Sequence, residues 1–546
     1  MQTVATALGR RLVRKGTPRP SGATTALQFG TSVIVSRFLL ILIVVAALGV
    51  RLILINQPFI DPWSWRQSDV AAIARNYFDN GFHFARPQID WAGNERGYVG
   101  TEFPILPFVA ALVYRSAGLQ EWIGRVQGVL FFIVSLPFFF LLVRRIFGGL
   151  TAIWATFFYA FAPLSIAASR AFMPDVPSLS LTIAGGYFFL RWIEEERLKW
   201  LISSAVLVSL ALLIKLPMAI IGAPLCYLAV TAVSDRRAVA ASLSRGVAES
   251  TATERRGYSF RGIATRWELW LFAAIALVPA TIWYWHAHRI AERFYPHHFF
   301  GAGGIQIMNF AWYWGIIRQT AFSSLTLVLF TLAIFGALIA PRGKHTRFFH
   351  WWLAAMTLFI FVAGYGNRHQ WYQLPLVPIA AVFAGCFCAW VGGRVQVPRL
   401  LRWAAALMLV ISFSVSSYLC AQPFYRPASA ALRNLGLELN EATTPAALII
   451  AATDGDPTVF YYAHRKGWHF LGDGVYDGNP LDSAQIIANL EKLRARGATH
   501  LAFYAGTQWW LEYYPEFAQH LAANATLVEQ TPEFTIYKLA AAAPSD

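Results

Sequence analysis

Long apolar stretches separated by short polar links constrain the fold of this chain more than any other feature. Crossing a hydrocarbon core of about 30 Å takes about 20 apolar residues in a helix. Eleven candidate stretches occur, at residues 33–55, 124–143, 150–168, 177–193, 200–214, 217–233, 267–285, 321–340, 348–365, 373–392 and 401–420. With 57% hydrophobic and 14% charged residues, the chain is too apolar for an ordinary soluble domain. We expect an α-helical polytopic membrane protein with about eleven transmembrane helices, although "IKLP" could make 200–233 one long broken helix.

Basic residues are concentrated in the N-terminal tail and in alternate links, and they dominate the net charge of +16. They are Arg10, Arg11, Arg14, Lys15 and Arg19, then Arg144 and Arg145, the run from Arg236 to Arg266, Arg342, Lys344 and Arg347, and Arg394, Arg399 and Arg402. This positive-inside pattern predicts a cytoplasmic N-terminus and argues against a nucleic-acid partner. With eleven spans, the residues after 421 lie on the opposite face. We therefore expect an integral plasma-membrane protein, located in the inner membrane in a bacterium.

Three segments outside the spans are long enough to build a site. In residues 56–123, "SDVAAIARNYFDNG" predicts an amphipathic helix and "FPILPFVAALVYRSAG" predicts a helix lying in the membrane interface. The second segment is 286–320. The third alternates strand and helix patterns from "AALIIAAT" to "FTIYKL", which predicts a small α/β domain. The predicted domains are a basic tail at 1–32, a transmembrane catalytic part at 33–420 and an extracytoplasmic α/β domain at 421–546.

Four carboxylates fall on the face predicted to be extracytoplasmic, namely Asp61, Asp69, Glu102 and Asp175. Acidic groups at span ends are costly unless they have a function. A partly desolvated Asp has a raised pKa and can act as a general base. Structural roles stay open for three of them. Asp61 and Asp69 are at positions that could cap helices, and Glu102 would favour the dipole of the helix that follows it.

Basic side chains fall on the same predicted face. Arg289, Arg293, Arg368 and Lys215 lie at predicted span ends or loops. Arginine can bind phosphate oxygens through two parallel hydrogen bonds, so these residues are candidates for holding an anionic lipid headgroup. The alternative is that they anchor spans at the membrane surface.

The histidines and cysteines do not indicate a metal site or a disulfide framework. His286 and His288 are two residues apart and His297 and His298 are adjacent, and neither spacing is that of a helical ligand pair. A structural or phosphate-contacting role is favoured for them. The four cysteines, all within or at the end of spans, are Cys226, Cys386, Cys388 and Cys420. We assign no metal and no cofactor, while metal dependence on a divalent ion stays open.

Six short motifs occur in a definite order over about residues 35–390. They are "SWRQSDVAAIARN", "TEFPILPF", "VRRIFG", "SRAFMPDVPSLSL", "LLIKLP" and "NRHQWYQLPLVPIAA". The series resembles the GT-C superfamily of integral-membrane glycosyltransferases. Within it, the chain is most similar to the branch of the protein O-mannosyltransferases and the aminoarabinose transferases that modify lipid A.

The resemblance implies a polyprenyl-phosphate sugar donor and an active site at the extracytoplasmic face. It also implies that an acid of the first loop is the base, here Asp69 or Asp61. The family's Glu-x-Pro element falls on Glu102 and Pro104, its second-loop Asp on Asp175, its Lys-x-Pro turn on Lys215 and Pro217, and its late Arg-to-Leu-Pro segment on the stretch that begins with Arg368 and His369.

The chain departs from the family pattern in two places. The usual Asp-Glu pair of the first loop is missing, and "WRQSD" brings an acid about one helical turn later. This leaves the choice between Asp61 and Asp69 open. Phe103 stands where the aminoarabinose branch has Lys, which makes transfer of another sugar the better expectation.

The favoured hypothesis is an inverting glycosyltransferase. Asp69 or Asp61 would deprotonate the acceptor, and Arg289, Arg293 and Arg368 would stabilise the departing lipid phosphate. Asp175 and Glu102 would orient either the acceptor or the base itself. The acceptor could be a lipid, a glycan or a protein. The alternative is a transporter or flippase of lipid-linked sugars, but transporters carry ionisable groups at mid-depth in the membrane, where these spans have few. A third hypothesis makes the C-terminal part a binding module through "TDGDPTVFYYAHRKGW", a sequence also typical of a turn followed by an amphipathic helix.

Overall fold

The computed structural model describes residues 22–232, 265–301, 304–343, 345–394, 396, 398–471 and 479–541. The basic tail up to Arg19, most of the basic link from Arg236 to Arg266, and Lys344 lie outside the described residues.

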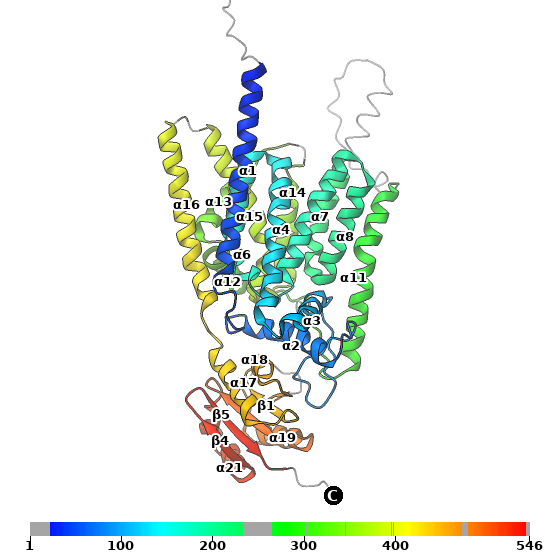
Figure 1. Cartoon of the computed structure of the whole chain (residues 1–546), viewed down its shortest axis with the longest axis vertical. Coiled ribbons are helices and arrows are strands. Elements are labelled where there is room, and N and C mark those ends of the chain that lie inside the picture. The colour runs from blue at the N-terminus through cyan, green and yellow to red at the C-terminus, as the bar shows by residue number, and fades with distance from the viewer. Residues whose placement is uncertain are drawn as a thin grey trace, which may run out of the picture.

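A bundle of helices running side by side makes up most of the chain (Figure 1). Its helices are α1 (Gly22–Leu52), α4 (Glu121–Phe147), α5 (Gly149–Phe161), α6 (Pro163–Ser169), α7 (Asp175–Glu195), α8 (Leu198–Ile214), α11 (Trp267–Arg293), α12 (Phe310–Gln319), α13 (Leu327–Ile339), α14 (Phe348–Val362), α15 (Leu376–Arg394) and α16 (Arg399–Ala421). A further apolar helix runs over Leu216–Ala232. Every predicted apolar stretch therefore overlaps helical structure.

Fewer than eleven helices have the length and composition of a membrane span. Among the described residues, five do: Val35–Leu52, Glu121–Phe147, Trp267–Arg293, Leu376–Arg394 and Arg399–Ala442. Counting each of two bent helix pairs as one span raises this number to seven. The count of eleven thus stays a prediction.

Two predicted spans are wrong as continuous helices. The stretch 150–168 breaks between α5 and α6 with a 58° bend. Pro163 lacks a backbone N–H, and Ala162 before it is extended. The stretch 321–340 breaks before α13, where α12 and its π-turn continuation meet α13 at 111°. There Thr326 has a φ of 76° and its side chain caps α13.

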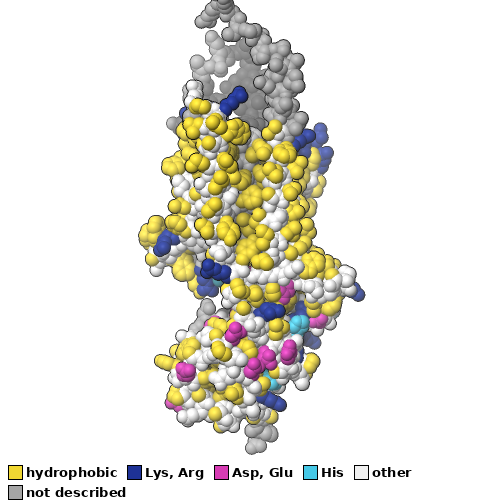
Figure 2. Space-filling view, turned by 60° about the vertical axis from the view of Figure 1, so that its left-hand side comes forward, with side chains coloured by type: hydrophobic (Ala, Val, Ile, Leu, Met, Phe, Trp, Pro, Cys, Tyr) yellow, Lys and Arg dark blue, Asp and Glu magenta, His cyan; other side chains and the backbone are white. Residues whose placement is uncertain are grey.

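The outer surface of the bundle is apolar. Large side chains such as Phe38, Trp270 and Leu338 are exposed on it, and Figure 2 shows hydrophobic side chains covering the helical part of the molecule. Acidic and histidine side chains gather instead on the lower part of this face. An apolar exterior around helices whose backbone groups are bonded internally is what a bilayer requires.

The C-terminal unit, residues 430–541, is a five-stranded sheet flanked by helices. Its elements are α17 (Ala430–Ala442), β1 (Leu448–Ala452), α18 (Thr458–Ala463), β2 (Lys466–His469), α19 (Ser483–Ala495), β3 (His500–Tyr504), α20 (Trp510–Tyr513), α21 (Pro515–Asn524), β4 (Ala525–Gln530) and β5 (Phe534–Leu539). The strand order is β2-β1-β3-β5-β4, with β1 parallel to β2 and β3, and β5 antiparallel to β3 and β4. The mixture of strands and helices agrees with the predicted α/β pattern, although β4 was not predicted. The three domain boundaries stay a prediction.

The first loop lies between the bundle and the C-terminal unit. It contains α2 (Ser64–Asn80) and α3 (Ile105–Ala117), which lie below the bundle and above α18 in Figure 1. Two backbone hydrogen bonds join the loop to β2: the Gly93 N–H donates to the Gly467 carbonyl at 2.6 Å, and the Gly467 N–H donates to the Asp90 carbonyl at 3.0 Å. Apolar residues of the loop and of the C-terminal unit share two buried clusters. The two parts therefore pack as one body.

Candidate functional site

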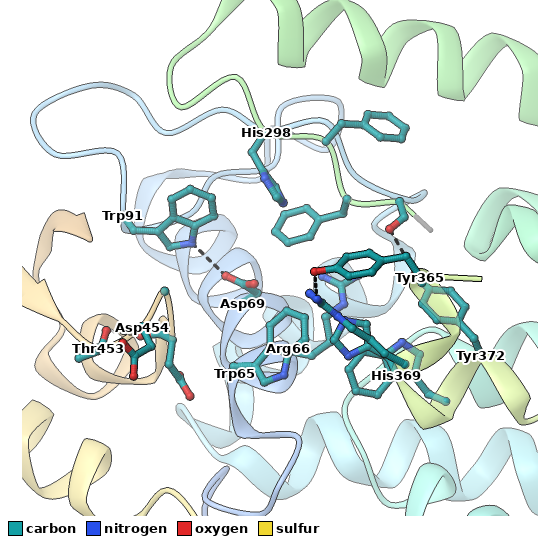
Figure 3. Close-up of a pocket in the computed structure, with 18 of the residues that line it drawn as sticks. Trp65, Arg66, Asp69, Trp91, His298, Tyr365, His369, Tyr372, Thr453 and Asp454 are labelled. Carbon is teal, nitrogen blue, oxygen red and sulfur yellow. Dashed lines mark hydrogen bonds between the residues drawn. The ribbon is translucent and has the colours of Figure 1, made fainter. Parts of the chain in front are cut away.

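A pocket of about 500 Å³ lies where the first loop, two links of the bundle and the C-terminal unit meet (Figure 3). Its lining residues come from four parts of the chain: Trp65, Arg66, Asp69, Trp91 and Glu102 of the first loop; His298, Phe299, Phe300 and Gly301; Tyr365, Gly366, Arg368, His369, Trp371 and Tyr372; and Leu432, Thr453, Asp454, Gly455, Asp456 and Tyr504. Of the nine predicted site residues, Asp69, Glu102, Arg368 and His369 line this pocket.

Helix α2 carries two charged residues of the pocket. It begins at Ser64, four residues earlier than "SDVAAIARNYFDNG" predicted, so Asp69 is inside the helix and the helix-cap alternative is wrong. Arg66 and Asp69 are three residues apart, and residues at this spacing lie on the same face of a helix. Figure 3 shows both side chains at the pocket.

Asp69 has the environment of a carboxyl group that can exchange a proton near neutral pH. It is 3% exposed, and burial raises its pKa to about 7 against the opposing effects of Arg66 and of a hydrogen bond from Trp91. The indole Nε1 of Trp91 donates to Oδ1 of Asp69 at 3.0 Å. Among the residues that the structure describes, none donates to Oδ2. Trp91 therefore holds Oδ1, and Oδ2 is available to accept a proton.

Glu102 is held as a carboxylate by two cations. Nη2 of Arg66 donates to its Oε1 and Oε2 at 3.0 and 2.9 Å, and Nζ of Lys215 is 3.4 Å from Oε1. Burial alone would raise the pKa of Glu102, but Arg66 and Lys215 lower it to about 2. With this pKa Glu102 stays ionised near neutral pH and is only a weak base, and its two bonds fix the position of Arg66.

Lys215 and Asp175 are not among the residues that line the pocket, but Lys215 contacts Glu102, which does line it. Both are 2% exposed, and Nζ of Lys215 is 3.3 Å from Oδ1 of Asp175. Lys215 therefore bridges Asp175 and Glu102. The predicted phosphate role of Lys215 and the catalytic role of Asp175 stay predictions, and the geometry favours support of Glu102.

Asp61 lies in a different environment from Asp69. Its Oδ2 receives a hydrogen bond from Nη2 of Arg125 at 3.0 Å, and Nε2 of Gln67 donates to Oδ1 at 2.8 Å. Oδ1 also accepts the backbone N–H of Trp63 at 3.0 Å. Asp61 does not line the pocket. The geometry favours a structural role for Asp61 and leaves Asp69 as the candidate base.

The predicted arginines separate into two groups. Arg368 lines the pocket and packs over the ring of Tyr365 at 4.1 Å. Arg289 and Arg293 lie on α11, which continues to Arg293 and is longer than predicted, and their side chains are exposed away from the pocket lining. A phosphate role for these two stays a prediction that the pocket does not support.

Two histidines of the pocket are neutral near pH 7. Burial lowers the pKa of His298 to about 4, with a further contribution from Arg66. Burial likewise lowers the pKa of His369 to about 4, with Arg368 adding to the effect. The His369 ring stacks on Trp371 with centroids 4.6 Å apart. Among the described residues, no group of three or more His, Cys, Asp or Glu side chains could hold a metal ion.

Several pocket residues were not predicted as site residues. Arg66 stood in the quoted motif "SWRQSD", and its spacing from Asp69 was the available signal. Asp454 and Asp456 were noted in the sequence but assigned to a turn. That turn joins β1 to α18 and forms one wall of the pocket. Trp91 and Tyr504 gave no signal, because only the folded chain brings them to the other residues.

Comparisons with known proteins agree with this architecture. The family model of dolichyl-phosphate-mannose-protein mannosyltransferases matches residues 101–246. A search of the curated proteins found no match. Among solved structures, ArnT from Cupriavidus metallidurans bound to undecaprenyl phosphate is 16% identical, with a TM-score of 0.61 over 92% of this chain and 99% of that one. Residues 101–246 are thus similar to the mannosyltransferase family, and the chain as a whole has the fold of ArnT.

A second group of similar structures comes from an archaeon. The oligosaccharyltransferase AglB from Archaeoglobus fulgidus, in complex with an inhibitory peptide and a dolichol-phosphate, is 12% identical, with a TM-score of 0.55 over 92% of this chain and 74% of that one. The family match and the shared fold together indicate a glycosyltransferase.

Proposed function

We propose that this protein transfers a sugar from a polyprenyl-phosphate donor to an acceptor at the extracytoplasmic face, with inversion, and that Asp69 is the general base. The observation that carries this proposal is Asp69 itself. It is a buried carboxyl group with a pKa of about 7, open to a pocket and one helical turn from Arg66. A general base with a pKa near the working pH is the most effective.

The reaction needs one base and one anion site. Asp69 removes the proton from an acceptor hydroxyl or amine while the acceptor atom attacks the anomeric carbon. The bond between the anomeric carbon and the phosphate oxygen breaks, and the lipid phosphate leaves with the bonding electron pair. Attack opposite the leaving group inverts the anomeric centre. Because a phosphate needs charge neutralisation more than a proton, fixed cations stabilise this transition state.

Arg66 is the best candidate for the phosphate contact. Its side chain is buried and Nη2 is held by Glu102, but Nη1 has no hydrogen-bond partner among the described residues. A buried unpaired donor is costly, and a phosphate oxygen in the pocket would satisfy it. Arg368 lines the same pocket from the opposite link. The similar ArnT structure was solved with undecaprenyl phosphate, which supports a donor of this class.

The test compares acid-to-amide variants of the full chain in detergent. Asp69→Asn keeps the shape of the side chain, and its amide oxygen can still accept from Trp91. We expect it to bind undecaprenyl phosphate normally but to lose about 10²- to 10⁴-fold in transfer from an undecaprenyl-phosphate sugar, the usual contribution of a general base. Asp79→Asn, an exposed acid on the same helix, is the matched control.

Three results would contradict parts of the proposal. Normal transfer by Asp69→Asn, with a correctly folded but inactive Asp61→Asn, would make Asp61 the base. Transfer by both variants would exclude a first-loop Asp. Movement of the lipid-linked sugar across vesicle membranes without release of free lipid phosphate would favour the transporter alternative.

A further inference from the structure

The charged residues of the pocket are ordered from one end to the other. Figure 3 shows Asp454 on one side of the pocket, Asp69 and Arg66 nearer its centre, and the neutral His369 on the other side. The C-terminal unit lines its end with two carboxylates, Asp454 and Asp456, and among the described lining residues it contributes no Lys, Arg or His. The bundle end is cationic, because Arg66 and Arg368 outnumber Glu102, the carboxylate that pairs with Arg66. The end formed by the C-terminal unit is acidic.

The acidic wall is built by the link between β1 and α18. Tyr504 of β3 donates through its hydroxyl to Oδ2 of Asp454 at 2.7 Å. Oδ1 of Asp456 accepts the backbone N–H of Thr458 at 2.9 Å. Ser68 of α2 contacts Thr458 through their hydroxyls at 3.2 Å, so the wall is fixed against the helix that carries Asp69. Oδ2 of Asp454 and Oδ1 of Asp456 are thus held by neighbouring groups of the C-terminal unit.

The reaction geometry assigns a role to each end. In a displacement with inversion, the acceptor atom and the leaving phosphate lie on opposite sides of the anomeric carbon. The phosphate belongs at the cationic end, because the buried Nη1 of Arg66 has no partner there. With the base between the two ends, the acceptor occupies the end formed by the C-terminal unit.

We propose that Asp454, Asp456 and Tyr504 form the acceptor subsite, and that the acceptor is a neutral glycan. This inference rests on the proposed glycosyltransferase function. Carboxylate oxygens accept hydrogen bonds from neighbouring hydroxyl groups, and the ring faces of Trp91 and Tyr504 can cover the C–H surface of a sugar. An acceptor that carries phosphate groups at this end would face like charges, which oppose binding.

The first experiment measures binding to the purified full-length protein by quenching of tryptophan fluorescence. The probes are undecaprenyl phosphate, a set of neutral hexose trisaccharides, the same trisaccharides with a 6-phosphate, and a Ser/Thr-containing hexapeptide. We expect the wild type to bind undecaprenyl phosphate and at least one neutral trisaccharide. We expect the phosphorylated form of that trisaccharide to bind at least about tenfold more weakly, since one unfavourable charge contact is worth about 1.4 kcal/mol or more.

The double variant Asp454→Asn/Asp456→Asn separates the acceptor subsite from the donor site. The amide oxygens can still accept from Tyr504 and Thr458, so the wall keeps its shape. We expect undecaprenyl phosphate to bind as in the wild type, the neutral trisaccharide about tenfold more weakly, and the difference between neutral and phosphorylated trisaccharides to disappear. Glu512→Gln, an exposed acid of the same unit outside the pocket, should leave all the affinities unchanged.

The outcomes of these measurements contradict different parts of the proposal. If the wild type does not bind undecaprenyl phosphate, the proposed function fails. If it binds the lipid phosphate but no neutral trisaccharide, or binds the peptide instead, the glycan acceptor is excluded while the donor site stands. If the double variant binds the neutral trisaccharide as the wild type does, the assignment of the subsite to the C-terminal unit is wrong.

Discussion

Two aspartates of the first loop show how partners decide the role of a residue. Asp61 is bonded to Arg125 and Gln67, so both of its oxygens are occupied. Among the described residues, Asp69 receives one hydrogen bond, from Trp91, and it opens to a pocket. The same side chain is thus a fixed structural anion at one position and a group able to exchange a proton at the other.

The pKa of Asp69 predicts the pH dependence of transfer. Because burial raises this pKa to about 7, the base is protonated and inactive below that pH. We expect kcat/KM to rise about tenfold per pH unit up to about 7 and then to level off. His298 and His369, with pKa values of about 4, are already neutral over this range. Asp456 titrates at about 6, one unit lower.

Initial rates from pH 5 to 8.5 at low donor concentration would measure this profile. Asp456→Asn should still show the rise of kcat/KM with pH up to about 7. The residual activity of Asp69→Asn should not show this rise. A flat wild-type profile between pH 5 and 7 would show that Asp69 does not act as the base.

Asp61 makes a prediction about stability. Asp61→Asn removes the negative charge next to Arg125, which is 1% exposed. Breaking a buried ion pair on one side typically costs about 3 kcal/mol, so the variant should unfold at a clearly lower temperature. Thermal unfolding in detergent measures this, with the exposed Asp79→Asn as control. An unchanged melting temperature would mean that the Asp61–Arg125 pair does not stabilise the fold.

Single residues were predictable from the sequence only where local context carried the information. Four carboxylates were found because acids near spans are rare, and the motif order indicated Glu102, Asp175 and Lys215. Their contacts with one another were not predictable, because Lys215 is 113 residues from Glu102 in the chain and the two meet only in the fold. The acidic wall was assigned to a turn because its sequence does have the character of a turn.

At the scale of the elements, helix positions were predictable and helix continuity was less so. Apolar composition located the helices of the bundle, but the sharp bends at Ala162 and Thr326 depend on backbone conformations that hydropathy does not report. The start of α2 was also missed, because "SWRQ" lacks apolar periodicity. Ser64 and Ser68 contact other segments through their hydroxyls, and Oε1 of Gln67 accepts the backbone N–H of Phe172, which explains why the helix extends over these polar residues.

The contact between the first loop and β2 gives a prediction at this scale. Gly93 has a φ of +61°, and a Cβ there would lie 1.9 Å from the Trp468 ring. Gly93→Ala should therefore cost about 1 kcal/mol for the backbone conformation and about 1–3 kcal/mol more for the clash. We expect a melting temperature several degrees lower and weaker acceptor binding, because the C-terminal unit shifts away from the pocket.

Gly118→Ala is the matched control for this variant. Gly118 has a φ of +73°, and nothing lies within 4 Å of its added Cβ, so it shares the backbone cost without the clash. Equal losses of stability in the two variants would show that close packing of Gly93 on Trp468 does not hold the C-terminal unit in place.

At the scale of the whole molecule, the two ends of the bundle differ in charge and in what they support. One end meets the first loop and the C-terminal unit, where the pocket lies (Figure 1). The other end carries Arg144 and Arg145 in the last turn of α4 and the arginines around the α15–α16 link. This asymmetry is the positive-inside pattern, and it predicts that the pocket opens to the extracytoplasmic side.

Reporter fusions to the full chain test this orientation. Alkaline phosphatase folds to an active form only outside the cytoplasm of a bacterium, whereas green fluorescent protein exported through the same route stays dark. We expect an active phosphatase after Asp546 and a fluorescent protein before Met1. A phosphatase fused after Gly393, at the end of α15 next to the arginines of the α15–α16 link, should be inactive. Substituting Arg394, Arg399 and Arg402 by Gln should weaken the preference at that link, because basic residues favour the cytoplasmic side of a membrane. The opposite result for both termini would place the pocket in the cytoplasm, where an extracytoplasmic acceptor could not reach Asp69.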